Sequence, residues 1–237
     1  MIVKTKTFGE YLLNDAYRYV LDSYYRDAKE ILGERMQLFV LTSSCGLDQC
    51  IPGWSDIDVL IVVDLLDFET LRKLHSAQSK YQVKIALALL SRYELDNKMF
   101  DDKTNVVFYQ LKESMLYINY ISDTSMVIPE VTLLDIQEDD LRMMPMYLHK
   151  LRRALYGSVM DKRQVIKMLY IVIKMRLRSK GHEIIAKSYK EAFSRFAEEF
   201  REEDFDIVTE MTSGIIASSE FISYARRVVE RICNGEI

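Results

Sequence analysis

The sequence predicts an α+β protein in which a small mixed-sheet domain is followed by a bundle of helices. In the first half of the chain, short apolar runs rich in β-forming residues alternate with helical segments. From residue 137 onward, apolar residues recur at the three- and four-residue spacing of helices. We therefore expect an α/β domain over residues 1–136 and a helical domain over residues 137–237.

The elements of the first half are expected in the order helix, strand, turn, strand, helix, strand. Residues 8–33 carry a broad apolar helical face, and Gly33 is a natural helix stop. The other predicted elements are strands at 37–42, 57–63 and 83–90, a turn at 43–46, a helix at 68–79, and weaker strand candidates at 106–111 and 115–121. The second strand is continuously apolar, which is typical of a strand covered on both faces.

The second half is predicted to form a helical bundle. Its expected helices are 139–156, 161–180, 187–200 and 204–233, and glycines interrupt or separate them. Four tyrosines cluster in the first helix of the chain, at positions 17, 19, 24 and 25. Core packing explains this cluster, and so does an interface between two copies of the chain, which would make a homodimer.

Composition excludes several classes of protein. Apolar residues make up 49% of the chain and charged residues 29%, as in soluble globular proteins. Three cysteines form no disulfide framework, and no apolar run reaches the length of a signal peptide core or a membrane span. These features indicate a cytoplasmic protein without a membrane partner.

The charges are unevenly distributed along the chain. Twelve Lys or Arg residues and two acids lie in residues 150–190, so this segment carries +10 in a chain whose net charge is −4. Basic side chains usually solvate outer helix faces. An excess of this size also fits a segment that faces a polyphosphate or a nucleic acid.

An aspartate pair is the strongest sign of chemistry. Asp56 and Asp58 lie two residues apart at the start of a predicted strand, so their side chains point to the same face. Two carboxylates this close repel each other, and a cation relieves the repulsion. Mg²⁺ prefers carboxylate and phosphate oxygens, and the pair therefore predicts a magnesium site. A pair of this kind also occurs on solvated strand edges.

A turn of small residues precedes the pair. Ser43 and Ser44 leave a buried strand and meet Gly46, so backbone N–H groups and hydroxyls of this turn could contact a phosphate. An ordinary side-chain-stabilised turn that leads into a surface strand is the alternative interpretation.

The chain here resembles the DNA polymerase β-like nucleotidyltransferase superfamily. That superfamily carries a Gly-Ser turn, a loop with a further Gly, and then Ser-Asp-hydrophobic-Asp before an apolar strand, and Ser55 begins the matching Ser-Asp-Ile-Asp segment here. The specific match covers about residues 40–64. The overall plan is similar to that of the aminoglycoside adenylyltransferases and the bacterial minimal nucleotidyltransferases.

The resemblance implies a function and a set of roles. Asp56 and Asp58 would hold two magnesium ions, and Ser44, with Ser43 and Ser55 beside it, would bind a nucleoside triphosphate, expected to be ATP. An acceptor hydroxyl would attack the α-phosphate and release pyrophosphate, so that AMP is transferred to a small molecule or a protein. Lys150 in the helical half is expected to contact phosphates by analogy.

The chain departs from the family pattern at two positions. Ser43 stands where the family has Gly, which adds a Cβ at the turn. Active members carry a third carboxylate on the next core strand, but residues 83–90 contain no acid, and Lys84 is their one charged residue. In one interpretation, Glu94, which follows this strand, or an acid of the helical half completes the site.

Lys84 leaves two interpretations open. It could lie against the triphosphate, so that the chain is a regulatory or antitoxin-like nucleotide-binding protein with weak or no transfer. It could also be an ordinary solvated residue, with one or two magnesium ions in the site. A third, separate hypothesis is an RNA-acting helical domain, because Arg176 and His182 show a spacing similar to that of helical HEPN ribonucleases.

Overall fold

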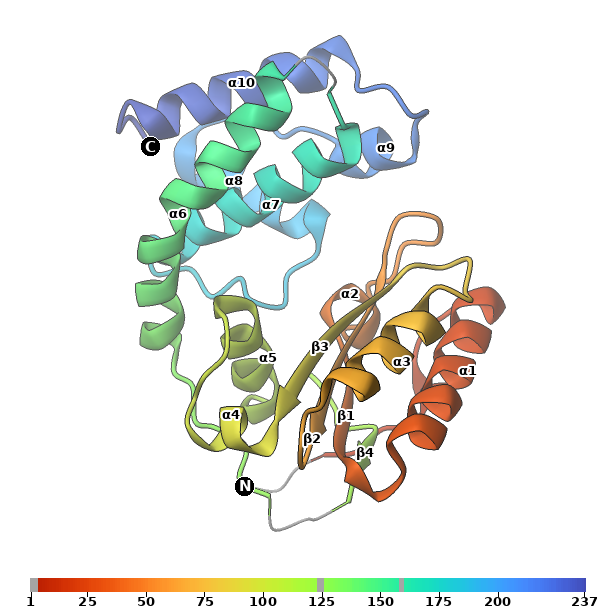
Figure 1. Cartoon of the computed structure of the whole chain (residues 1–237). Helices are drawn as coiled ribbons and strands as arrows, with labels where there is room; N and C mark the ends of the chain where they lie inside the picture. Colours follow the sequence, from red (N-terminus) through yellow and green to blue (C-terminus); the bar gives the residue numbers. More distant parts are fainter. Residues whose placement is uncertain (1–3, 123–125, 158–159) are drawn as a thin grey trace. The chain divides into compact units, whose positions relative to one another are not determined.

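The computed structural model describes residues 4–122, 126–157 and 160–237. The chain divides into two compact units, Met1–Leu133 and Leu134–Ile237. The first unit carries the sheet, and the second is helical (Figure 1). The predicted domain boundary, after residue 136, lies in the first turn of helix α6 (Leu133–Tyr156).

A four-stranded mixed sheet is the frame of the first unit. Its strands are β1 (Met36–Thr42), β2 (Ile57–Val63), β3 (Ile85–Ser91) and β4 (Tyr120–Ile121), in the spatial order β3-β2-β1-β4. β1 is antiparallel to β2 and β4, whereas β2 and β3 are parallel. A parallel pair needs a crossover, and helix α3 (Phe68–Gln78) lies in it. The α+β fold class and the three main strands are therefore confirmed, with small shifts at the strand ends.

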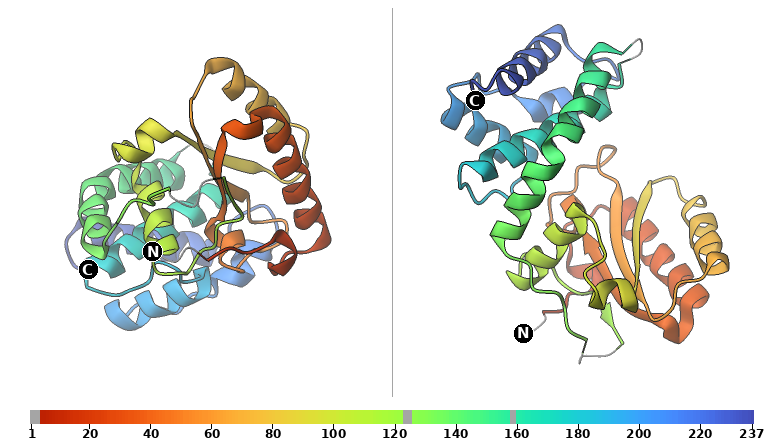
Figure 2. Two further views of the ribbon diagram at one scale, coloured as in Figure 1. Left: turned by 90° about the horizontal axis from the view of Figure 1, so that it is seen from below. Right: turned by 60° about the vertical axis from the view of Figure 1, so that its left-hand side comes forward.

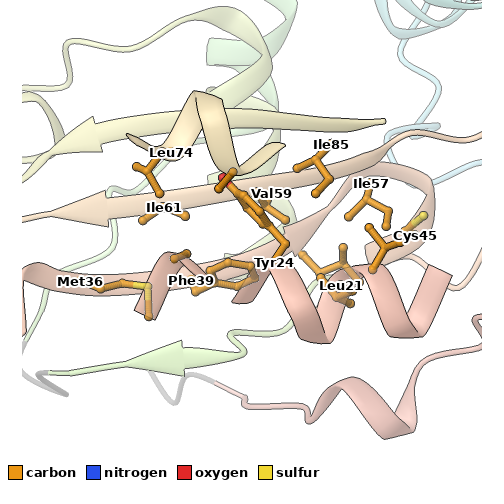
Figure 3. Close-up of a cluster of buried hydrophobic side chains, with 14 of the residues drawn as sticks. Leu21, Tyr24, Met36, Phe39, Cys45, Ile57, Val59, Ile61, Leu74 and Ile85 are labelled. Atoms are coloured by element: carbon orange, nitrogen blue, oxygen red, sulfur yellow. The ribbon is translucent and has the colours of Figure 1, made fainter. Parts of the chain in front are cut away.

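Helices α1 (Asp15–Leu32) and α3 cover one face of this sheet (Figure 1). Leu21 and Tyr24 of α1 pack toward Val59 and Ile61 of β2, and all four side chains are buried (Figure 3). Helix α5 (Asp102–Lys112) lies on the other side of the sheet (Figures 1 and 2). Because both faces of β2 are covered, the strand is continuously apolar after its first aspartate.

The α5 helix corrects the prediction of a strand over residues 106–111. Asp101 caps this helix, because its Oδ1 accepts hydrogen bonds from the Thr104 backbone N at 2.9 Å and the Thr104 hydroxyl at 2.7 Å. Thr104, Phe108 and Leu111 are all buried, at helical spacing. A cap five residues before this apolar run thus favours a helix over a strand. Of the candidate strand over residues 115–121, only β4 forms.

The first helix is shorter than expected. Residues 8–33 do not form one helix: α1 begins at Asp15, and a short 3₁₀ turn, η1 (Phe8–Glu10), precedes it. The Oδ1 of Asn14 accepts a hydrogen bond from the Tyr17 backbone N at 3.0 Å and so caps α1.

The described residues of the second unit form the helices α6, α7 (Lys162–Ser179), α8 (Tyr189–Phe200), α9 (Ile207–Thr212) and α10 (Ser219–Cys233) (Figure 2). Helix α7 packs against α8, and α8 against α9. A buried ion pair between Asp140 and Arg178 joins α6 to α7. In the part of the chain that the structure describes, no helix has the length and apolar character needed to cross a membrane.

Two helix ends in this unit differ from the expectation. α6 begins at Leu133 rather than at residue 139. The single helix predicted over residues 204–233 is divided into α9 and α10, because Asp206 and Ser218 each cap a new helix. The Ser218 hydroxyl also donates to Glu210 at 2.7 Å, which fixes the break.

Candidate active site

The two aspartates meet at the start of β2. Asp58 is the second residue of the strand, and Asp56 directly precedes it. Asp56 is 8% exposed, and Asp58 is half-buried. Asp58 lies opposite Thr42 at the end of β1 and opposite Ala86 near the start of β3. The pair therefore stands at the edge of the sheet where β1 ends and β2 and β3 begin.

The turn after β1 is a single helical turn, α2 (Ser43–Gly46). Ser43 has φ of +54°, in the left-handed region that favours glycine. Gly46 is buried, and a Cβ there would lie 2.3 Å from the carbonyl oxygen of Leu41. Ser43 thus has a backbone conformation that favours glycine, the residue that the family resemblance implies at this position.

Hydrogen bonds of hydroxyl groups stabilise the loop between the Ser43–Gly46 turn and the aspartates. Ser44 Oγ donates to Ser55 Oγ at 3.1 Å, and Ser55 Oγ accepts from the Ile51 backbone N at 2.9 Å. The Thr42 hydroxyl donates to the Asp58 carbonyl at 3.1 Å. The structure therefore brings Ser44 and Ser55 together beside the aspartates. Ser43 is exposed and Ser44 is half-buried, whereas Ser55 is buried and part of the loop's internal structure.

Tyr17 is a positioning residue that the sequence analysis missed. Its hydroxyl donates to the Ser55 carbonyl at 2.8 Å and accepts from the Gly53 backbone N at 3.2 Å. Tyr17 and Tyr24 are buried in the core, as core packing predicts, whereas Tyr19 is 67% exposed. A hydroxyl at a buried helix position is the only sequence signal that could have pointed to this role.

Cys45 contacts the backbone at Asp56. Its thiol lies 3.5 Å from the Asp56 carbonyl. A hydrogen bond to Cys50, followed by burial, raises the pKa of the Cys45 thiol, and the same hydrogen bond lowers the pKa of Cys50. Cys45 is therefore a neutral, buried thiol that supports the loop.

Lys84 lies next to the aspartates. Its Nζ is 3.6 Å from Asp56 Oδ2, and its side chain is 73% exposed. Its carbonyl oxygen accepts a hydrogen bond from the Ile57 backbone N at 2.9 Å, so its backbone is fixed between the two aspartates. Lys84 thus has an exposed side chain on a backbone that is fixed by a hydrogen bond.

Glu94 does not complete the site. It forms the capping box of α4 (Arg92–Asp96), where it accepts from the Ser91 backbone N at 2.7 Å and from the Ser91 hydroxyl at 2.8 Å. β2 and β3 are in parallel register with Asp58 opposite Ala86, so Ser91 lies roughly 17 Å farther along the sheet. The hypothesis that Glu94 supplies the third carboxylate is therefore wrong.

The donor set suits one magnesium ion that is shared with phosphates. Asp56 and Asp58 offer two carboxylates at the start of β2, and Mg²⁺ is commonly held by one or two carboxylates plus substrate phosphates. Within residues 4–122, 126–157 and 160–237, no group of three or more His, Cys, Asp or Glu side chains could hold a metal ion. The residues do not provide the three-carboxylate set that the family resemblance implies.

Several basic residues of the helical unit form ion pairs with acids of the same unit. Arg178 and Lys162 are buried in ion pairs with Asp140 and Glu210, and Lys187 pairs with Glu191. Lys150 is exposed on α6, with its Nζ 5.5 Å from the centre of the Tyr147 ring. The predicted role of Lys150 at phosphates stays a prediction.

Arg176 and His182 have separate partners. His182 Nε2 lies 2.8 Å from Glu199 Oε2, and its Nδ1 lies 3.3 Å from Arg195. Arg176 donates to the Ser179 hydroxyl at 3.4 Å. These contacts stabilise the end of α7 and the loop after it.

No protein-family model matches this sequence, and no curated protein matches it. A solved structure does match the fold. Spectinomycin adenyltransferase AAD(9) from Enterococcus faecialis, whose crystal structure contains ATP and spectinomycin, superposes with a TM-score of 0.63 at 14% sequence identity. The match covers 92% of this chain and 98% of that one. The chain has the nucleotidyltransferase fold. The shared fold includes both the mixed sheet and the helices that follow it, because the match covers nearly the whole chain.

Proposed function

We propose that the chain transfers a nucleoside monophosphate, AMP from ATP, to a hydroxyl group of a small molecule or a protein. One observation carries this proposal: Asp56 and Asp58 stand at the start of β2 near the turn of Ser43 and Ser44, in a nucleotidyltransferase fold. The similar adenyltransferase was crystallised with ATP, which supports ATP as the nucleotide.

The proposed reaction is a substitution at the α-phosphorus. The acceptor oxygen forms a bond to this phosphorus, the bond to the oxygen that bridges to the β-phosphorus breaks, pyrophosphate leaves, and the hydroxyl proton passes to solvent. Mg²⁺ held by Asp56 and Asp58 would neutralise charge on the phosphates. The backbone of the Ser43–Gly46 turn would present N–H groups to the triphosphate.

The acceptor is proposed to be neutral or anionic. A cationic acceptor such as an aminoglycoside calls for an acidic pocket, whereas residues 150–190 carry +10. This excess also keeps a nucleic acid as a proposed partner, and the cytoplasm as the proposed location.

A pyrophosphate-release assay with ATP, Mg²⁺ and a panel of hydroxyl acceptors tests the proposal. Turnover is expected with at least one acceptor, and Asp56→Asn and Asp58→Asn are each expected to lower it by at least about a hundredfold. Asp64→Asn is the matched control, because Asp64 is exposed just beyond the other end of β2. Turnover that is unchanged in both site variants would exclude this site.

Lys84 favours a second function, nucleotide binding without transfer, as in a regulatory or antitoxin-like protein. Its ammonium group stands beside Asp56, where active relatives by resemblance have an acid. Calorimetry with ATP and Mg²⁺, run beside the release assay, separates the two functions. Binding of ATP with no release of pyrophosphate for any acceptor would select the second.

The RNA-acting alternative rests on Arg176 and His182. It predicts RNA binding that weakens steeply with salt and RNA cleavage that is lost in His182→Ala. Cleavage that persists in this variant would remove the hypothesis.

A further inference from the structure

The carboxylates and the lysine at the start of β2 and β3 show an unusual balance of charge. Lys84, Ala86 and Ala88 alternate along one face beside Asp56 and Asp58, and none of the three supplies an acid. The nearest acid after β3, Glu94, is at the far end of that strand. Along the starts of β2 and β3, the charged side chains are therefore two carboxylates and one ammonium group.

Charge arithmetic links the lysine to a metal ion. Replacing a carboxylate by an ammonium group changes the charge by +2, which is the charge of one divalent cation. Two acids, one lysine and one Mg²⁺ thus present the same total charge to a triphosphate as three acids and two Mg²⁺. The electrostatic requirement of the phosphates can be met with one metal ion fewer.

The geometry of Lys84 suits such a replacement. Its backbone is fixed by the hydrogen bond to Ile57, while its side chain is 73% exposed and touches Asp56 at 3.6 Å, which is longer than a hydrogen bond. An exposed lysine of this kind has four rotatable bonds, so its ammonium group can move a few ångströms from Asp56 to a phosphate oxygen.

We propose that this site takes a single divalent cation with the nucleoside triphosphate, and that the Lys84 ammonium group occupies the place of the second cation. This inference rests on the proposed function, because it concerns the same nucleotide site. Lys84 pairs with Asp56 when the site is empty and with the triphosphate when nucleotide is bound. It is a nucleotide-binding residue that sets the metal requirement.

Counting bound Mn²⁺ tests the inference without any need for turnover. Electron paramagnetic resonance and calorimetry would measure Mn²⁺ per chain and the affinity for α,β-methylene-ATP, a non-reactive analogue. The wild-type chain is expected to bind one Mn²⁺ with the analogue. Lys84→Met, which keeps the length but removes the charge, is expected to bind one Mn²⁺ and to lose about tenfold or more in analogue affinity. Lys84→Glu, which supplies a third carboxylate, is expected to bind two.

A matched control and two contrary results complete the design. Lys80→Met removes a nearby exposed lysine that pairs with Asp27, and it should leave metal count and affinity unchanged. Two Mn²⁺ in the wild type, or an unchanged analogue affinity in Lys84→Met, would overturn the inference while leaving the proposed function in place. Failure of the wild type to bind the analogue with any concentration of Mn²⁺ would instead overturn the proposed function.

Discussion

Two aspartates, one in each unit, are almost equally buried but have very different partners. Asp140 is 4% exposed and receives two hydrogen bonds from Arg178, each 2.6 Å long, from a guanidinium group that is itself 6% exposed. Asp56 is 8% exposed and is approached at 3.6 Å by Lys84, whose side chain is largely in solvent. Asp140 is held by two short hydrogen bonds, whereas the lysine that approaches Asp56 lies mostly in solvent.

This difference separates structural charge from charge that is available to a ligand. A buried pair with two short hydrogen bonds is strongly destabilised when one partner is removed, because the other charge stays buried. Lys162 and Glu210 form a second such pair, at 3.2 Å, and Lys162 also donates to the Gly214 carbonyl. The basic excess of residues 150–190 is thus partly structural, whereas the acids of the first unit stand at an open strand end.

Matched substitutions of the two aspartates would give the largest effect. Asp140→Asn leaves Arg178 buried without its counter-charge, so the free energy of unfolding should fall by roughly 3–5 kcal/mol. Asp56→Asn removes an acid beside a like charge and should lower it by less than Asp140→Asn does. Guanidinium unfolding followed by circular dichroism measures both. Equal losses in the two variants would break the comparison.

Gly46→Ala tests whether close backbone packing, rather than paired charge, holds the first unit's site. The added Cβ would lie 2.3 Å from the Leu41 carbonyl oxygen and 2.8 Å from Leu116 Cδ2. The turn must shift, and the free energy of unfolding should fall by roughly 1–3 kcal/mol. Gly9→Ala is the control in the same unfolding experiment, because a Cβ there meets nothing within 4 Å. An equal effect of the two substitutions would contradict the packing argument.

Lys174, whose amine is buried near Arg178, offers a test of buried charge in the second unit. Burial, with a smaller effect of Arg178, lowers the pKa of Lys174 to about 7 from its ordinary value of 10.5. The unfolded chain then binds more protons between these two values, so stability should rise with pH from about 7 to 10.5, by at most about 1.4 kcal/mol per pH unit.

Lys174→Met should remove this dependence on pH in melts recorded across that range. Lys180→Met, at an exposed lysine just beyond the end of α7, should keep it. A wild-type stability that is flat with pH would show that the amine is charged in the folded chain.

Ser43→Gly should give the smallest effect and the opposite sign. A left-handed backbone at a non-glycine residue costs roughly 1–2 kcal/mol, and glycine loses part of this gain through its more flexible unfolded chain. A rise of roughly 0.5–1 kcal/mol in the free energy of unfolding is expected. Ser44→Gly should instead lower it, because Ser44 donates to Ser55. A loss in both variants would mean that Ser43 has a role of its own in the turn.

Local patterns determined much of the fold and the core of the site. The period of apolar residues placed β1, β2 and β3 and the long helices. The buried face of a helix or strand repeats every few residues, so the pattern can be recognised in a short stretch of sequence. The spacing of Asp56 and Asp58 likewise predicted both at the start of one strand, and Asp58 is the second residue of β2 while Asp56 directly precedes the strand. Short elements were less well predicted: α5 and the break before α10 depend on the caps Asp101 and Ser218.

Contacts between distant segments were decided only by the tertiary structure. The parallel register of β2 and β3 places Ala86 opposite Asp58, brings Lys84 to Asp56 and carries Glu94 to the far end of the sheet. Packing of α1 on the sheet turns the Tyr17 hydroxyl toward the loop before the aspartates. A sequence encodes which residues are apolar and how they repeat, but the register of two strands is settled by the packing of their whole buried faces. The aspartate pair could therefore be predicted from the sequence, whereas its lysine neighbour could not.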